Sequence, residues 1–128
     1  MKEKGSRAER ELVHKFYDTY PWIALRAPGS GSTPLPSPDV LATNTKRYLA
    51  IECKSIKSKQ KTFKPEEIEQ LLEFSKRFGA EPWIGIKFNH KGWFFIKPEE
   101  IKQTKQNNYS ITLNLVEEKG IKFEKLIQ

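Results

Sequence analysis

The segment from Arg47 to Ser55 constrains the fold most, because it is the clearest strand in the sequence. Its apolar members are Tyr48, Leu49, Ile51 and Cys53. A Lys-rich stretch follows, then apolar residues at helical spacing over 65–78, and then an apolar strand over 83–88. Strands and helices in this order predict an α/β fold, with a mixed central β-sheet flanked by helices.

The other expected elements complete this plan. The first helix should begin at an N-cap, Ser6, which forms a capping box with Glu9, and should end at Pro21. We expect a helix over 6–20, strands over 22–27, 39–42 and 93–96, turns over 43–46 and 89–92, a flexible Pro/Gly/Ser-rich loop over 28–38, a basic loop over 56–64 and a short helix over 98–102. The tail beyond about residue 100 receives no assigned element.

The helix over 65–78 carries more apolar residues than one core face needs. Its expected inward residues are Ile68, Leu71, Leu72, Ser75 and Phe78, and Gly79 is its expected C-terminal stop. Phe74 and Phe78 extend the apolar face sideways. A surplus strip of this kind favours an interface, although a single wide core face also explains it.

Length and composition favour one intracellular domain. The chain has 128 residues, which fits a single compact domain. No apolar run is long enough to span a bilayer, and the N-terminus lacks the apolar segment of a signal peptide. Cys53 is the only cysteine, which excludes a disulfide framework and favours a reducing, cytoplasmic location. No membrane partner is expected.

The positive charge is concentrated in one block. The chain carries a net charge of +7. Residues 44–64 contain seven Lys and Arg residues against one acid, Glu52, so this block accounts for +6. Such a block suits a polyanion such as nucleic acid, although a solvated Lys-rich loop would have the same composition.

Three charged residues lie where strands are expected. Glu52 and Lys54 are two apart on one strand and therefore share a face, whereas Cys53 points the other way, into the core. If the segment after Asp39 pairs with this strand, Asp39 reaches Glu52. Two carboxylates, with the Cys53 backbone carbonyl between them, suit Mg²⁺, and Lys54 could orient water or offset charge on a phosphate. A turn aspartate beside a surface Glu–Lys pair is the simpler alternative.

The spacing Pro38–Asp39, twelve residues, Glu52–Cys53–Lys54 matches the PD-(D/E)xK nuclease signature. Over at least residues 4–96 the chain resembles the archaeal Holliday junction resolvases. The blocks that carry this resemblance are KGSRAERELV at 4–13, RAPGSGS at 26–32, PDVLA at 38–42, AIECKS at 50–55, LEFSKRFG at 72–79, IKF at 86–88 and WFF at 93–95. The family usually has Val or Met at the position of Cys53, which is a conservative difference.

The resemblance implies a restriction-endonuclease-like core and a role for each matching residue. Asp39, Glu52 and Glu9 would be metal ligands, together with the Cys53 carbonyl, for Mg²⁺ or a substituting Mn²⁺. Lys54 and Ser30 would be catalytic. The residues expected to contact DNA are Arg10, Arg26, Ser30, Ser32, Lys57, Lys59 and Lys61, and the dimer interface would contain Phe74 and Phe78.

This resemblance implies an endonuclease that resolves four-way DNA junctions during recombination and repair, as a homodimer that associates with the nucleoid. Two alternatives remain at this point: another nuclease of the same fold that cuts duplex DNA, and a non-catalytic DNA-binding module. Simpler roles also remain for Glu9 in helix capping, for Ser30 in loop flexibility and for Arg26 at the surface.

Overall fold

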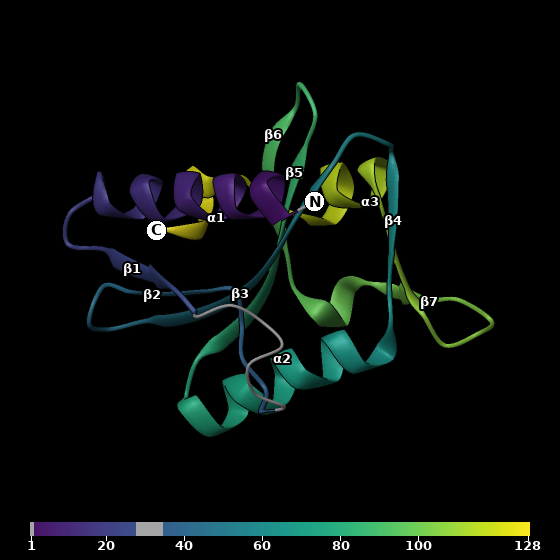
Figure 1. Cartoon of the computed structure of the whole chain (residues 1–128), viewed down its shortest axis with the longest axis horizontal. Coiled ribbons are helices and arrows are strands. Elements are labelled where there is room, and N and C mark those ends of the chain that lie inside the picture. The colour runs from purple at the N-terminus through teal and green to yellow at the C-terminus, as the bar shows by residue number, and fades with distance from the viewer. Residues whose placement is uncertain (1, 28–34) are drawn as a thin grey trace.

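Two helices enclose a mixed five-stranded sheet. The computed structural model describes residues 2–27 and 35–128, and the side chains of residues 6–27 and 35–128. The elements are α1 (Lys2–Tyr17), β1 (Ile23–Arg26), β2 (Val40–Thr43), β3 (Tyr48–Ile56), β4 (Gln60–Phe63), α2 (Pro65–Phe78), β5 (Glu81–Phe88), β6 (Gly92–Ile96), η1 (Pro98–Glu100), β7 (Lys102–Gln103), β8 (Tyr109–Thr112), α3 (Leu113–Lys119) and α4 (Phe123–Leu126) (Figure 1).

The main sheet has the order β1-β2-β3-β5-β6. Its pairs are antiparallel except for β3 and β5, which run parallel and are connected through β4 and α2. A parallel pair needs such a long crossover, and the helix of that crossover packs on the sheet. The predicted α/β architecture with a mixed sheet is therefore confirmed.

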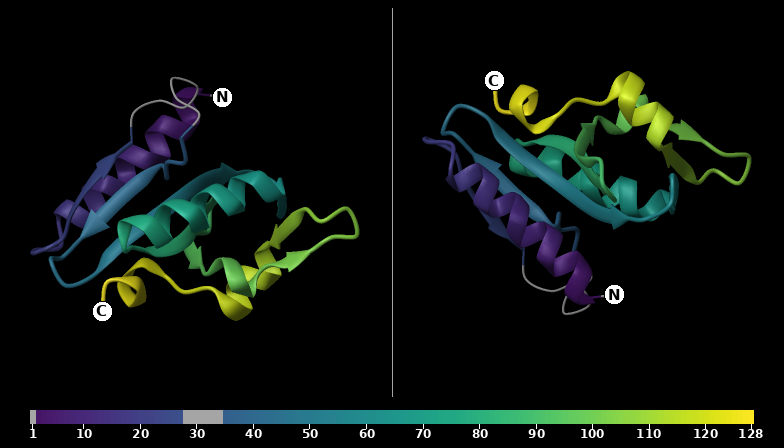
Figure 2. Two further views of the ribbon diagram at one scale, coloured as in Figure 1. Left: turned by 90° about the horizontal axis from the view of Figure 1, so that it is seen from below. Right: turned by 90° about the horizontal axis from the view of Figure 1, so that it is seen from above.

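Each face of the sheet has its own apolar core. On one face, α1 and α4 pack against residues that include Val40, Ile51 and Cys53. On the other face, α2 and α3 pack against residues that include Ala50 and Ile84. The two long helices lie on opposite sides of the sheet in Figure 2. Successive residues of β3 thus alternate between the α1 face and the α2 face.

The predicted start and end of the first helix are wrong. The helix begins at Lys2 and ends at Tyr17, so Ser6 lies inside it and cannot be its N-cap. The side chains of Ser6 and Glu9 instead face Arg26 of β1. Ser6 and Glu9 therefore contact a strand that is distant in the sequence, and they do not mark the start of the helix.

Two further expectations are corrected by long-range pairing. The expected basic loop over 56–64 contains a strand, β4, which pairs with β8 in a second sheet ordered β4-β8-β7. The tail supplies that partner, and its alternating apolar run divides between β8 and α3. Sequence alone shows no partner for β4, because β8 lies almost 50 residues away.

The boundaries of the second helix are confirmed, with Gly79 in the left-handed conformation at its C-terminus. Ile68, Leu71 and Ser75 are buried as expected. Leu72 and Phe78, however, are 41% and 52% exposed, so their predicted inward position is wrong. They flank the inward stripe on opposite sides because each residue turns the helix by about 100°.

Candidate metal-dependent nuclease site

The backbone of Asp39 is held between two strands. Its N–H donates to the carbonyl of Ile51 at 3.1 Å, and its own carbonyl accepts from the Ala27 N–H at 2.9 Å. Its side-chain Oδ2 accepts the backbone N–H of Cys53 at 2.8 Å. The carboxylate is therefore fixed against β3, at the point where β2 begins.

The register brings Asp39 beside Glu52. Val40 pairs with Ile51, so the preceding residue, Asp39, lies next to Glu52. Val40 and Ile51 both belong to the core on the α1 face. Because side chains alternate along strands, Asp39, Glu52 and Lys54 share the opposite face. The expected proximity of the two carboxylates is confirmed.

The two carboxylates repel each other when both are ionised, and both have raised pKa values. Burial raises the pKa of Glu52 to about 8, and the charge of Asp39 adds to the rise. Burial likewise raises the pKa of Asp39 to about 6, although the hydrogen bond from the Cys53 N–H opposes the rise. A pair of partly buried acids with raised pKa values is a favourable site for a cation, because the cation offsets their negative charge.

Cys53 lies on the other side of β3, in the core. Burial raises the pKa of its thiol well above the usual range. Since the thiolate is the nucleophilic form, this thiol is unsuited to nucleophilic catalysis. The expectation of a small, buried, structural residue is confirmed.

Glu67 is a member of the site that the sequence did not reveal. Its Oε1 lies 3.3 Å from the Lys54 Nζ, and its Oε2 accepts the backbone N–H of Lys64 at 3.1 Å. Lys54 also lies over the ring of Phe63, at 5.7 Å from its centroid. An acid in the first turn of a helix is also favoured by the positive charge at the helix start. The sequence signal of Glu67, an acid two residues after a Pro, cannot distinguish the two roles.

Glu9 and Arg26 form a neighbouring group on the α1 face. Glu9 Oε1 accepts from Arg26 Nε at 3.1 Å, and Ser6 Oγ accepts from Arg26 Nη2 at 3.0 Å. The charge of Glu9 contributes to the raised pKa values of both Asp39 and Glu52. The charge of Glu9 therefore acts on the carboxylate pair, while its side chain accepts a hydrogen bond from Arg26.

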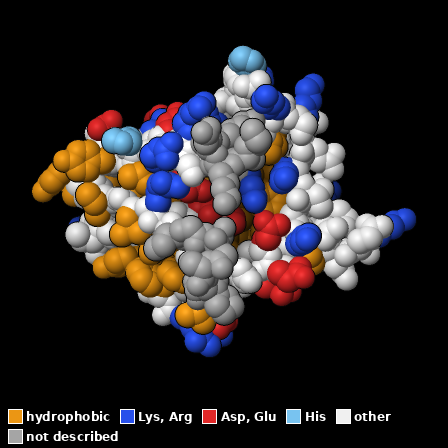
Figure 3. All heavy atoms as spheres, in the orientation of Figure 1, with side chains coloured by type: hydrophobic (Ala, Val, Ile, Leu, Met, Phe, Trp, Pro, Cys, Tyr) orange, Lys and Arg blue, Asp and Glu red, His pale blue; other side chains and the backbone are white. Residues whose placement is uncertain are grey.

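Most of the predicted DNA-contacting residues that the structure describes are exposed. Arg10, Lys57, Lys59 and Lys61 are exposed. Ser30 and Ser32 lie outside the described residues. In Figure 3, acidic side chains lie near the middle of the visible face, with Lys and Arg side chains on several sides of them. Such an arrangement attracts a polyanion while leaving a central place for a cation.

The donors fit a hard divalent cation that retains other ligands. Within residues 6–27 and 35–128, no group of three or more His, Cys, Asp and Glu side chains is arranged to hold a metal ion. Two carboxylates remain, and Mg²⁺ is commonly held by one or two carboxylates together with water and phosphate oxygens. The residues present therefore fit such an ion and do not fit a tetrahedral zinc site.

A separate apolar surface lies at the β1 edge of the α2 face. We define it by Ile23, Leu25, Tyr48, Phe74 and Phe78. Ile23, Leu25, Tyr48 and Phe78 are exposed, and the rings of Phe74 and Phe78 stack with centroids 5.1 Å apart. Tyr48 meets Phe78 edge to face at 6.4 Å. The two phenylalanines were predicted from helical spacing, whereas the three strand residues were not predicted. Their alternation along β1 and β3 was the signal that could have identified them.

No helix among the described residues has the length and apolar character needed to cross a membrane.

Comparison with known proteins identifies close relatives. Crossover junction endodeoxyribonuclease Hjc of Archaeoglobus fulgidus is 38% identical over 107 residues, which cover 84% of this chain and 78% of the relative. The Hjc protein of Sulfurisphaera tokodaii is 38% identical over 129 residues, covering 99% and 88%. The solved structure of Archaeoglobus fulgidus Hjc, a Holliday junction resolvase, matches with a TM-score of 0.89 at 31% identity, over 97% of this chain and 100% of that chain.

This structural match confirms the restriction-endonuclease-like fold. A family profile described as archaeal Holliday junction resolvase matches residues 1–128, which includes the tail that the sequence resemblance did not cover. The chain therefore belongs to the archaeal Holliday junction resolvase family.

Proposed function

We propose that this protein is a metal-dependent endonuclease that resolves four-way DNA junctions, with the whole chain acting as a single nuclease domain. The observation that carries the proposal is the pair of partly buried carboxylates, Asp39 and Glu52, beside Lys54 in a chain of this family. The curated relatives are named as crossover junction endodeoxyribonucleases. We expect such an enzyme in the cytoplasm, where it would associate with the nucleoid.

We propose that Asp39, Glu52 and the carbonyl of Cys53 hold Mg²⁺, for which Mn²⁺ can substitute, and that Glu9 contributes from the α1 face. When bound, the cation supplies positive charge to the scissile phosphate and lowers the pKa of a coordinated water. Because burial raises the pKa of Glu52, a cation held here would favour the ionised form of this residue.

Lys54 supplies a second positive charge on the same face. Its ammonium group can donate hydrogen bonds to a phosphate oxygen or orient the attacking water. Glu67 holds that ammonium group at 3.3 Å, and Phe63 forms one wall beside it. These contacts restrict where the Lys54 Nζ can lie, which is the condition for stabilising charge on one particular oxygen. We assign Ser30, from the loop before Asp39, a further catalytic contact.

DNA binding would be carried mainly by phosphate contacts from Arg10, Arg26, Ser30, Ser32 and the exposed lysines Lys57, Lys59 and Lys61. Contacts of this kind recognise the shape of the backbone and carry little sequence information. Affinity should therefore fall steeply with salt.

We propose a homodimer that buries the apolar surface formed by Ile23, Leu25, Tyr48, Phe74 and Phe78. Each chain carries one carboxylate pair, and a four-way junction requires two cuts related by an approximate two-fold axis. Exposed aromatic residues in contact with one another are typical of such an interface. A two-fold dimer would present two equal sites to the two strands.

The test compares a four-way junction with a linear duplex of the same sequence, in the presence of Mg²⁺. We expect paired, symmetric nicks in the junction and little cleavage of the duplex. Equal cleavage rates would favour a duplex-cutting nuclease of the same fold. If no branched or duplex substrate is cut, a non-catalytic DNA-binding module becomes the better explanation.

A further inference from the structure

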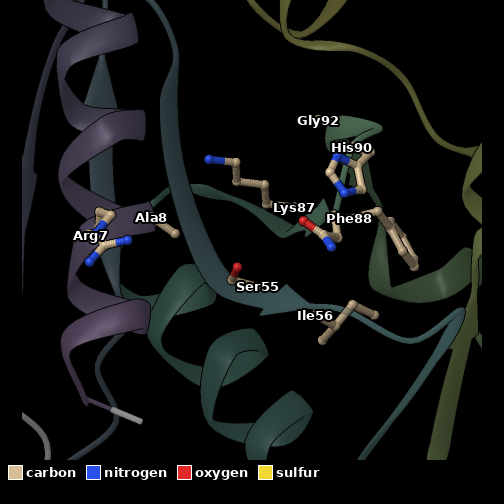
Figure 4. Close-up of a pocket in the computed structure, with 9 residues that line it drawn as sticks. Arg7, Ala8, Ser55, Ile56, Lys87, Phe88, His90 and Gly92 are labelled. Atoms are coloured by element: carbon tan, nitrogen blue, oxygen red, sulfur yellow. The ribbon is translucent and has the colours of Figure 1, made fainter.

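A cavity of ≈ 350 Å³ lies on the α1 face, outside the carboxylate site. Figure 4 shows its walls: Arg7 comes from α1, Ser55 from the end of β3, and Lys87 and His90 from β5 and the turn that follows it. Ser55 pairs with Lys87 in the parallel register, so both side chains point to the same face. The cavity is therefore built at the carboxyl ends of the two central strands.

Every polar side chain that lines this cavity can donate a hydrogen bond. Arg7 and Lys87 are cations, and Ser55, Asn89 and His90 can each donate a hydrogen bond. Among the residues whose side chains the structure describes, no Asp or Glu lines the cavity. Glu11, which does not line it, forms an ion pair with Lys87. This lining suits an anion with several oxygen atoms.

Most of these donors are available. The side chains of Arg7, Ser55, Asn89 and His90 have no hydrogen bond or ion pair with any other part of residues 6–27 and 35–128. The backbone N–H of Asn89 donates to the carbonyl of Ile56 at 3.1 Å, which fixes the turn without using its side chain. A guanidinium group with free donors is the side chain best suited to bind phosphate.

The position of the cavity points to a phosphate of DNA. Ser55 directly follows Lys54, and adjacent residues of a strand point to opposite faces. Lys54 and Ser55 thus lie on opposite faces of the same strand end, and a DNA strand that passes over the end of β3 would bring different phosphates to the two residues. The cavity also lies against α1, whose residues Ser6 and Glu9 hold the proposed phosphate ligand Arg26.

We propose that this cavity binds a phosphate of the DNA backbone other than the scissile phosphate, through Arg7, Ser55, Asn89 and His90. The inference rests on the proposed function and extends it, because none of these four residues belongs to the carboxylate site. The cavity would fix the direction in which the cut strand crosses the enzyme.

The test uses the full chain without divalent metal and a four-way junction in which single phosphates near the cut site are replaced, one at a time, by uncharged methylphosphonates. For the unsubstituted protein we expect one position at which the replacement weakens binding about three- to tenfold. Arg7→Gln should weaken binding to the unmodified junction by a similar factor, lower the salt slope by about one, and remove the sensitivity at that position.

Asn89→Ala leaves the net charge unchanged and should also reduce that sensitivity. Lys91→Gln is the matched control, because Lys91 is an exposed cation of the same turn that does not line the cavity. It should keep the positional pattern. The proposal is wrong if Arg7→Gln and Asn89→Ala retain the full pattern, or if Lys91→Gln changes it as much as they do.

Two further readouts separate the possible failures. If the unsubstituted protein cuts the junction with Mg²⁺ but shows no sensitive phosphate, the cavity proposal fails while the proposed function stands. If it cuts no junction, the proposed function fails. Inorganic phosphate at millimolar concentration should not displace the junction from the unsubstituted protein, and selective displacement that Arg7→Gln abolishes would identify a free-phosphate site instead.

Discussion

Replacing Asp39 with asparagine should stabilise the metal-free protein while abolishing cleavage. The carboxylate is held in a partly buried position beside Glu52, and its pKa rises from 3.8 to about 6. Asparagine keeps an oxygen that can accept the Cys53 N–H, which Asp39 now accepts at 2.8 Å. Asp39→Asn therefore removes the charge and retains the contact that fixes the side chain.

The size of the effect follows from the shift in pKa. Each unit corresponds to about 1.4 kcal/mol, so ionised Asp39 lowers the free energy of unfolding by about 3 kcal/mol at most. An acid whose pKa is raised by folding destabilises the protein only where it is ionised. The penalty is absent below the unfolded pKa and develops as pH rises from about 4 through about 6.

The assay is denaturation by urea in the presence of a chelator, with both proteins at about pH 8 and at about pH 4. We expect Asp39→Asn to be more stable by about 1–3 kcal/mol at the higher pH and by less than about 1 kcal/mol at the lower pH. Comparison at equal pH cancels the effect of titrating groups that do not interact with Asp39. Glu52 does interact with it, and loss of the Asp39 charge relieves part of the rise in the Glu52 pKa, which adds to the stability of the variant at the higher pH. Addition of Mg²⁺ should stabilise the unsubstituted protein and leave the variant unchanged.

Cleavage of the junction should be lost in the variant, while binding of the junction is retained, because the basic surface is untouched. The reasoning is refuted if the variant is no more stable at the higher pH, or if its advantage is the same at both values. Loss of junction binding in proportion to cleavage would contradict the role of Asp39 in holding a metal.

The remaining predictions concern the position of Lys54 and the dimer. Glu67→Gln should lower the cleavage rate at saturating junction by about tenfold with little change in junction affinity, because it frees the Lys54 ammonium group. The control is Glu66→Gln, which replaces an exposed acid of the same helix turn and should retain the rate. Equal loss in both variants, or a loss confined to affinity, would mean that Glu67 acts only through the helix. Phe74→Arg combined with Phe78→Arg should convert the dimer to a monomer in sedimentation measurements, whereas Leu72→Arg on the opposite flank of α2 should not; a dimer that survives the double substitution would exclude the proposed interface.

Local patterns in the sequence were sufficient for several elements. The β3 strand and the α2 helix have strong apolar periodicity, and Gly79 ends the helix where a left-handed residue is needed. The proximity of Asp39 to Glu52 was also predictable, because a short turn leaves two antiparallel strands few possible registers. Alternation along β3 then separated Cys53 from its charged neighbours.

Other features depended on partners that are distant in the sequence. The basic stretch after β3 became a strand only because β8 pairs with it, and Ser6 and Glu9 proved to be partners of Arg26 instead of a helix cap. The ion pair between Glu67 and Lys54 joins a helix start to a strand. No pattern along the chain contains these contacts, since they arise only when two elements pack.

Sequence alone was thus enough to predict the main helices and strands as far as β6 except β4, the face that carries the two carboxylates and the location of most of the excess charge. These depend on side-chain alternation and on local propensity, which act over a few residues. Only the folded structure shows how far the pKa values of Asp39 and Glu52 rise, which acid contacts Lys54 and where the donor-lined cavity opens on the α1 face. Those properties depend on burial and on distances between charges, which exist only after the chain has folded.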